Sequence, residues 1–223
     1  MSGNEVDNEK VICDRVKTAY KAGQTKEEVR DIYNGLADIY DTYSQPDQYQ
    51  GPVQTAIECC EVIPEANREG ALVLDVAAGT GLLGKELQLR GFRNLHALEP
   101  STKMLEKANT RNIYKKFINE FISEEALVQV AADTYDIVAS CGGMGQGHIP
   151  AGAVWEMLRI TRKGGFIILA MREEYLRHPQ YDGILEVLME NMEETGKWKT
   201  IKKRIIAKWF MKMDGVVFVF EKA

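Results

Sequence analysis

A glycine-rich turn that follows a short apolar run is the part of this sequence with the clearest chemical use. Residues 72–76 read LVLDV, which predicts a buried strand, and glycines follow at Gly79, Gly81 and Gly84. Glycine lets the backbone approach a ligand closely, and the helix that follows points free N–H groups and its positive dipole end at the same place. The G-x-G-x-x-G spacing therefore predicts a site for a nucleotide-like cofactor.

Two acidic residues near this turn help to distinguish between cofactors. Glu99 follows Gly79 by 20 residues, at the end of a second predicted strand, where an acid can accept both ribose hydroxyls. Asp75 lies inside the first strand, and a buried carboxylate there needs a cation or good hydrogen-bond donors. S-adenosylmethionine carries an ammonium and a sulfonium, whereas a dinucleotide carries a negative pyrophosphate. The acids favour S-adenosylmethionine, and an NAD(P)-dependent oxidoreductase that uses the same glycines stays open as an alternative.

The elements that must position these residues alternate between strand and helix. We expect strands over residues 72–76, 95–98, 116–118, 135–140 and 166–171, and helices over residues 82–90, 102–109, 151–161 and 181–195. The last segment breaks this order, because strand-like runs at 199–213 and 216–220 flank Asp214-Gly215, a strong hairpin signal. The pattern predicts an α/β fold: a Rossmann-like, mostly parallel seven-stranded sheet with helices on both faces and a C-terminal antiparallel hairpin.

The N-terminal third reads as helical. Helices are predicted over residues 5–22, 26–40 and 53–63, with a loop over 43–52, and Thr25 with Glu28 forms a capping box for the second helix. We expect residues 1–65 to cap the cofactor site and residues 66–223 to form the cofactor-binding domain, the two together making one structural unit.

Charge and composition restrict the partners. The 223 residues carry a net charge of −5, which does not suit a groove that tracks nucleic-acid phosphates and favours a small molecule or a protein as partner. The four cysteines (Cys13, Cys59, Cys60 and Cys141) include no CxxC pair, so neither a disulfide framework nor a metal site is expected. Without a signal peptide or an apolar run long enough for a bilayer, we expect no membrane contact and a cytoplasmic location, with the nucleus also open. Oligomeric state is not predicted.

Five stretches carry a family resemblance in their order along the chain. They are residues 33–41 (YNGLADIYD), 73–81 (VLDVAAGTG), 98–105 (LEPSTKML), 135–138 (YDIV) and 158–166 (LRITRKGGF). Together they resemble the class I S-adenosylmethionine-dependent methyltransferases over about residues 30–172. Residues 142–150 (GGMGQGHIP) are most similar to the subfamily of the methyltransferase-like protein of the Williams–Beuren syndrome region.

The resemblance implies a set of cofactor contacts. Asp75 would orient the methionyl ammonium, Glu99 would hold the ribose, and the other implied contacts are Tyr33, Ala77, Gly79, Gly81, Pro100, Met104, Phe121, Ile122 and Ser140. The chain departs from the family pattern in two places. Ala77 stands where many members have glycine, and Phe121 falls where an acid is expected after the third strand. Adenine recognition would then use backbone groups near Phe121 and Ile122, or Glu120.

The methyl acceptor is harder to predict, because a sulfonium methyl is already activated and the protein mainly supplies orientation and exclusion of water. No catalytic residue is assigned. The fourth strand ends in Ser140-Cys141-Gly142-Gly143 and lacks the Asn-Pro-Pro-Tyr type of motif, which argues against planar amide or adenine nitrogens as acceptors. By position, the acceptor side is expected to hold His148, Arg172 and Tyr175, with Trp209 as a further candidate, whereas His96 is expected to be structural.

The sequence thus predicts methyl transfer from S-adenosylmethionine to a small-molecule or protein acceptor, with S-adenosylhomocysteine as the product. Besides the oxidoreductase, two further alternatives stay open. One is an adaptor that binds S-adenosylmethionine without transferring the methyl group, and the other is a structural domain that binds neither cofactor.

Overall fold

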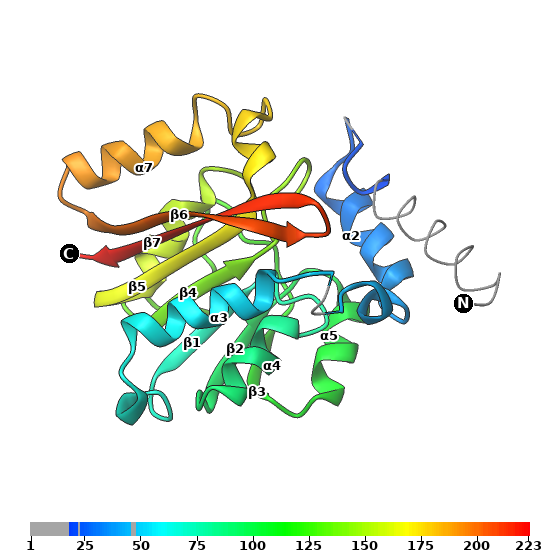
Figure 1. Ribbon diagram of the computed structural model, residues 1–223, viewed down its shortest axis with the longest axis horizontal. Helices are drawn as coiled ribbons and strands as arrows, with labels where there is room; N and C mark the ends of the chain where they lie inside the picture. The colour runs from blue at the N-terminus through cyan, green and yellow to red at the C-terminus, as the bar shows by residue number, and fades with distance from the viewer. Residues whose placement is uncertain (1–17, 22, 46–47) are drawn as a thin grey trace.

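A computed structural model describes residues 18–21, 23–45 and 48–223 of the chain, and a seven-stranded sheet forms its centre (Figure 1). The strand order is β3-β2-β1-β4-β5-β7-β6. Strands β1 to β5 run parallel to one another, whereas β7 pairs antiparallel with both β5 and β6. The strands are β1 (Leu72–Val76), β2 (Asn94–Leu98), β3 (Tyr114–Ile118), β4 (Tyr135–Cys141), β5 (Thr161–Arg172), β6 (Trp198–Phe210) and β7 (Met213–Lys222). The predicted fold class is confirmed.

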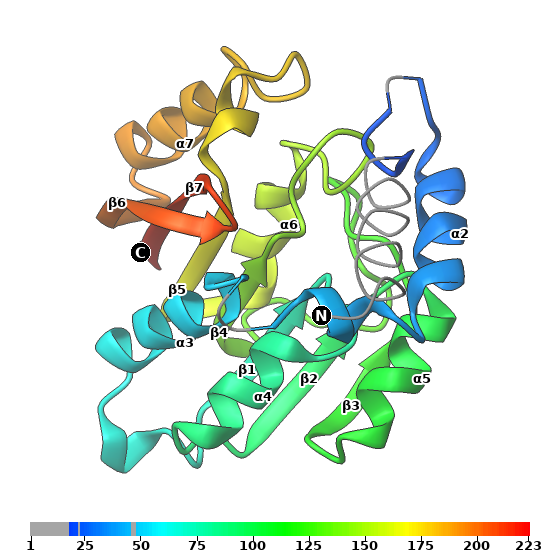
Figure 2. The ribbon, with the colours of Figure 1, turned by 45° about the vertical axis from the view of Figure 1, so that its right-hand side comes forward.

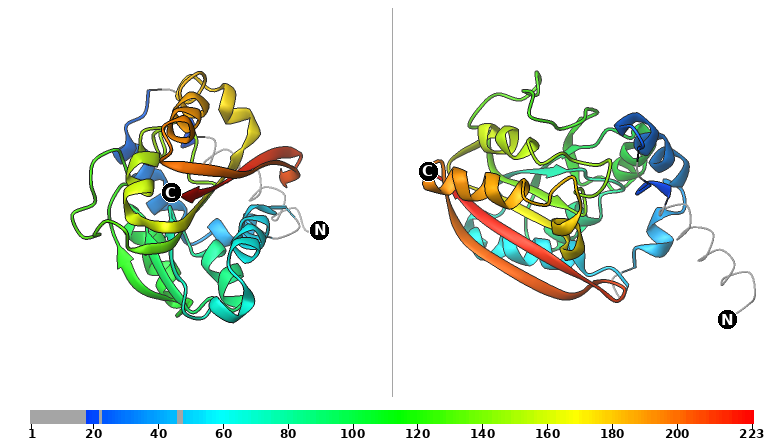
Figure 3. Two further views of the ribbon diagram at one scale, coloured as in Figure 1. Left: turned by 90° about the vertical axis from the view of Figure 1, so that its left-hand side faces the viewer. Right: turned by 90° about the horizontal axis from the view of Figure 1, so that it is seen from above.

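Helices cover both faces of the sheet because consecutive strand residues point to opposite sides (Figure 3). Val73 and Ile168 belong to the core beneath α3 (Gly51–Val62), α4 (Leu82–Leu89) and α5 (Thr102–Thr110). Leu74 and Ile167 belong to the core beneath α6 (Ala153–Ile160) and α7 (Leu185–Glu194). Strands β1 and β4 and residues 167–171 of β5 are therefore buried on both sides, which explains their mostly apolar sequences.

The N-terminal segment lies across the carboxyl ends of the parallel strands, on the side of the sheet where the glycine turn follows β1. Helix α2 (Lys26–Leu36) starts with the predicted capping box, in which Glu28 N–H donates to Thr25 Oγ1 at 3.2 Å and Thr25 N–H donates to Glu28 Oε2 at 2.8 Å. It ends earlier than predicted and is followed by the short 3₁₀ helix η1 (Tyr40–Tyr43). Helix α2 lies beside α5 (Figure 2), where Ser101 Oγ donates to Asn34 Oδ1 at 2.8 Å.

Two expectations for this segment remain predictions. The helix predicted over 5–22 lies outside the described residues except for residues 18–21. The domain boundary at residue 65 is untested, and α3, which precedes it, packs against β4, β5 and α4.

The C-terminal hairpin is present, but the predicted turn at Asp214-Gly215 is wrong. The chain reverses at Met211 and Lys212, and Phe210 pairs with Met213. Both Asp214 and Gly215 belong to strand β7, so the Asp-Gly pair has a role other than turning the chain.

Packing within the hairpin explains why these two residues occur there. Asp214 Oδ1 accepts from Lys208 N–H at 2.9 Å, where the β6–β7 register is irregular and Lys208 has a φ of +53°. A Cβ atom on Gly215 would lie 2.4 Å from Trp209 Cγ, so only glycine fits beneath that indole. A local turn signal was therefore overridden by a cross-strand contact.

Other differences concern element boundaries. Strand β3 begins at Tyr114, two residues before the predicted start, and α7 begins at Leu185. Helix α6 ends at Ile160, and the chain enters β5 at Thr161 with an irregular register against β4. Within the described part of the chain, no helix is long and apolar enough to cross a membrane, and no group of His, Cys, Asp or Glu side chains could hold a metal ion.

Candidate cofactor and acceptor site

The turn between β1 and α4 is built around two glycines in the left-handed region. Gly79 has a φ of +55° and Gly81 a φ of +88°. A Cβ atom on Gly79 would meet nothing within 4 Å, so open space lies above this backbone. Gly84 has a different role, because a Cβ there would lie 2.2 Å from Tyr114 Oη and would separate α4 from β3. The turn thus exposes its backbone at Gly79 while its helix packs closely.

Ala77, the residue where the sequence departs from the glycine expected by resemblance, also adopts a left-handed conformation, with a φ of +56°. This conformation costs a non-glycine residue roughly 1–2 kcal/mol. The turn therefore keeps its shape at Ala77 in spite of backbone strain.

Replacing Ala77 by glycine is expected to stabilise the fold by roughly 0.5–1 kcal/mol, because the relief of strain exceeds the added flexibility of the unfolded chain. Urea unfolding of the cofactor-free protein measures the change. Ala78→Gly is the matched control: Ala78 is buried and is not among the positive-φ residues, so this variant should be destabilised. A lower stability for Ala77→Gly would show that its methyl group contributes more through packing than the backbone loses through strain.

Two buried carboxylates flank the turn, and within the described residues neither forms an ion pair. Asp75 is 2% exposed and accepts from Tyr114 Oη at 2.6 Å. Glu99 is 7% exposed and accepts from the N–H groups of Gly79, at 3.0 Å, and Ser101, at 2.8 Å. Burial raises the pKa of each carboxyl group to about 7, although these donors oppose the shift. A cationic ligand would favour the ionised form of both.

Sequence reasoning missed Tyr114, which faces Asp75, and Asn119. Asn119 Nδ2 donates to the carbonyl oxygens of Glu99, at 2.8 Å, and Pro100, at 2.9 Å, so it fixes the chain at the end of β2. A polar residue directly after a strand was the signal that could have identified Asn119. Nothing comparable pointed to Tyr114, because its partner is distant in sequence.

The remaining predicted cofactor residues are distributed around the ends of the strands. Met104 is 1% exposed and packs with Leu36 and Ala37 beneath α2. Ser140 ends up opposite Val76, and its buried Oγ has no hydrogen-bond partner in the described part of the chain. An orphaned hydroxyl at this place fits a site that a ligand completes.

The structure separates the positions proposed for adenine recognition. Ile122 is buried in the core beneath α6, while Phe121 is half-buried with Lys26 Nζ 5.0 Å from its ring centroid. Glu120 is at the surface, where it accepts from Gln129 Nε2 at 2.5 Å. Of the three, Phe121 has the most suitable position for a contact at the edge of the site.

Asp41 joins the N-terminal segment to the glycine turn, a connection that the sequence did not predict. It accepts from Thr80 Oγ1 at 2.5 Å and from the guanidinium of Arg111. Arg111 Nε also donates to the Thr80 carbonyl oxygen at 2.6 Å. The 3₁₀ helix η1 is thereby held against the turn.

His148 and Tyr33 meet directly on the acceptor side. Tyr33 Oη lies 2.9 Å from His148 Nε2, and His148 Nδ1 lies 2.7 Å from the Gln146 carbonyl oxygen. A carbonyl can only accept, so Nδ1 carries the proton and Nε2 accepts from the tyrosine. Burial lowers the pKa of His148 to about 4, which leaves the ring uncharged at neutral pH. Tyr33, predicted as a cofactor cover, thus also contacts the acceptor side.

Tyr20 connects the predicted acceptor residues. Its ring stacks on His148, with centroids 4.6 Å apart, and on Tyr175, at 5.6 Å. The guanidinium carbon of Arg172 lies 5.3 Å from the Tyr20 centroid. His148, Arg172 and Tyr175 are therefore brought together around a residue that sequence analysis did not single out.

The other acceptor-side candidates have structural surroundings. Trp209 is 2% exposed and packs edge-on against Tyr49. Burial raises the pKa of the Cys141 thiol to about 12, so Cys141 is not ionised at neutral pH. His96 Nδ1 lies 3.1 Å from Tyr135 Oη. A structural role for His96 fits this contact.

The glycines after β4 are needed for packing. A Cβ on Gly142 would lie 2.5 Å from Tyr49 Oη, one on Gly143 2.6 Å from Ser140 Oγ, and one on Gly145 2.8 Å from the Tyr20 ring. Side chains from both the N-terminal segment and the sheet therefore lie directly on this loop.

Comparison with known proteins identifies this arrangement. Residues 74–169 match the family described as methyltransferase domain. The Homo sapiens protein methyltransferase-like protein 27 is 32% identical over 168 residues, which is 75% of this chain and 67% of that protein. The chain belongs to the class I S-adenosylmethionine-dependent methyltransferases.

Solved structures share the fold of this methyltransferase at low sequence identity. A Synechocystis magnesium protoporphyrin IX methyltransferase with bound S-adenosylmethionine has a TM-score of 0.66 at 15% identity, covering 91% of this chain and 100% of that one. A Leishmania major S-adenosylmethionine-dependent methyltransferase has a TM-score of 0.62 at 15% identity, covering 88% and 82%. The family assignment decides against the oxidoreductase and the bare structural domain. The narrower resemblance to the Williams–Beuren subfamily stays a prediction.

Proposed function

We propose that this methyltransferase holds S-adenosylmethionine over the β1–α4 turn and transfers its methyl group to a small molecule enclosed beneath the N-terminal segment. The observation that carries the proposal is the pair of buried carboxylates, Asp75 and Glu99, which lack a cationic partner among the described residues. Glu99 accepts from the N–H of Gly79, above which lies open space. The orphaned Ser140 hydroxyl adds a further polar group to the same region.

These residues fit the charges of the family's cofactor. S-adenosylmethionine supplies a methyl group that its sulfonium has already activated for displacement. Asp75 would favour the methionyl ammonium, Glu99 would accept the ribose hydroxyls, and the Gly79 backbone would line the methionine part. Both carboxyl groups have a pKa of about 7, so they ionise readily beside a positive ligand.

The acceptor side supports a small molecule over a folded protein. Tyr20 and Tyr33 of the N-terminal segment contact His148 of the β4–α6 loop, so the acceptor would lie behind side chains rather than on an open face. Neutral His148 adds no positive charge near a sulfonium. Enclosure excludes water, which supports transfer to the acceptor instead of hydrolysis.

A methyl-transfer assay with fractionated acceptors tests this function. The protein is incubated with methyl-labelled S-adenosylmethionine and either the dialysable or the macromolecular fraction of a cell extract. We expect label in the dialysable fraction, and much less of it with a Glu99→Ala variant at the same subsaturating concentration of S-adenosylmethionine. Label found only in the macromolecular fraction would show that the acceptor is a macromolecule such as a protein, and would contradict the proposal of a small-molecule acceptor. Calorimetric binding of S-adenosylhomocysteine without any transfer would instead support the silent adaptor.

A further inference from the structure

Arg172 occupies an unusual position at the carboxyl end of β5. Its guanidinium carbon lies 5.3 Å from the Tyr20 ring centroid, 5.4 Å from that of Tyr175 and 4.9 Å from that of Phe210. The side chain is only 17% exposed. Three rings from three separate parts of the chain thus surround one largely buried positive charge.

Within the described part of the chain, most of the hydrogen-bond donors of Arg172 have no acceptor. A guanidinium has five N–H donors, and aromatic faces attract its charge without accepting in the manner of an oxygen atom. Among the described residues, its one side-chain hydrogen bond goes to Glu174 Oε1 at 3.5 Å, the outer limit for such a bond. Glu174 is 54% exposed, so water competes with this contact.

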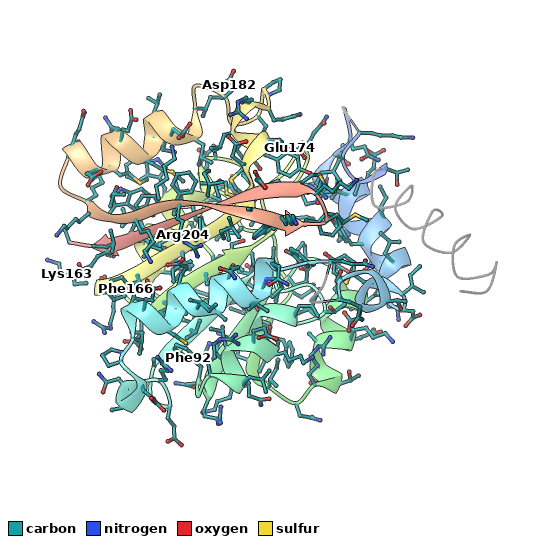
Figure 4. All side chains as sticks on the ribbon, viewed as in Figure 1. Phe92, Lys163, Phe166, Glu174, Asp182 and Arg204 are labelled. Carbon is teal, nitrogen blue, oxygen red and sulfur yellow. The ribbon has the colours of Figure 1, made fainter. Side chains whose placement is uncertain are left out.

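The position of Arg172 places these donors on the acceptor side. Cys141, the last residue of β4, lies opposite Ala170 of β5. Arg172, two residues further along β5, therefore lies just beyond the end of β4 that carries Ser140. Figure 4 shows Glu174 at the end of β5 nearest α2, and Lys163 and Phe166 at the other end. The ring of Tyr20 bridges Arg172 to His148.

We infer that Arg172 binds a carboxylate of the methyl acceptor. The inference rests on the proposed function, because it concerns the acceptor of that site. A carboxylate matches a guanidinium through two parallel hydrogen bonds. The chain as a whole carries a charge of −5, so attraction for an anion must come from a local group of this kind.

Matched acid and amide probes test the inference on protein loaded with S-adenosylhomocysteine. Benzoate is compared with benzamide, and naphthoate with naphthamide, by ligand-detected NMR titration. The carboxylates should bind about fivefold more tightly than their amides. Arg172→Gln should abolish this preference, and Arg172→Lys should keep part of it because the charge remains without the planar fork.

Two further variants sharpen the result. Arg177→Gln is the control, since Arg177 is 70% exposed and pairs with Glu173 at the surface, and it should leave the preference unchanged. Glu174→Gln should strengthen carboxylate binding about twofold by removing a competing anion. Equal binding of acids and amides, no binding of either, or an unchanged preference in Arg172→Gln would overturn the inference. Loss of S-adenosylhomocysteine binding by the wild-type protein would count against the proposed function itself.

Discussion

Replacing Asp75 by asparagine will lower the affinity for S-adenosylhomocysteine at least tenfold, which corresponds to about 1.4 kcal/mol. Asparagine keeps the shape of the side chain and can still accept from Tyr114 Oη, whose bond to Asp75 measures 2.6 Å. The variant therefore removes the negative charge and little else. Isothermal calorimetry at pH 7.5 measures the change, and Asp75→Ala should behave in the same direction.

The same substitution will stabilise the cofactor-free protein at alkaline pH. Burial raises the pKa of Asp75 from an ordinary value of 3.8 to about 7 in the folded state. The folded state therefore holds its proton over a pH range in which the unfolded chain has lost it, so wild-type stability falls as pH rises from about 4 to about 7. Asp75→Asn lacks this penalty, and its advantage in melting temperature should be absent at pH 4 and largest above pH 7.

Affinity should follow the opposite trend with pH. An ammonium favours the ionised carboxylate, so wild-type affinity for S-adenosylhomocysteine should rise as pH increases from 6 toward 7.5, and the rise should be smaller in Asp75→Asn. If Asp75→Asn bound S-adenosylhomocysteine as tightly as the wild type and with the same pH profile, Asp75 would have no role in binding the ammonium. Its role would then be packing against Tyr114 and α4.

Replacing Glu99 by alanine is also expected to weaken S-adenosylhomocysteine binding at least tenfold, about 1.4 kcal/mol. Two effects act together. The variant removes the acceptor for the ribose hydroxyls, and it also removes the carboxylate that receives the N–H groups of Gly79 and Ser101. The backbone at Gly79, which should line the cofactor, thereby loses the hydrogen bond that holds it to the end of β2.

Calorimetry with adenosine alongside S-adenosylhomocysteine separates these effects from a general loss of structure. Glu99→Ala should weaken both ligands, since both contain the ribose. Glu190→Ala is the matched control, because Glu190 is exposed on α7 and belongs to none of the expected cofactor contacts. Unchanged affinity for both ligands in Glu99→Ala would refute the ribose assignment.

The amino-acid order alone determined the fold class and the position of the glycine turn after β1. A short apolar run such as residues 72–76, followed by glycines, favours a buried strand, and glycine such as Gly79 is favoured where the backbone adopts a left-handed conformation. Capping signals were equally local, which is why Thr25 was correctly predicted as a helix start. Each of these features depends on residues close together along the chain.

Contacts between distant segments were decided only by the tertiary structure. The pairing of Asp75 with Tyr114, the stacking of Tyr20 on His148 and the aromatic surroundings of Arg172 join residues that no local pattern relates. The predicted position of the hairpin turn was wrong for the same reason, because Gly215 is needed for its contact with Trp209 and does not form the turn. Sequence determines what a short segment can form by itself, whereas side-chain partners depend on how strands and helices pack, and that packing set the charge and shape of this site.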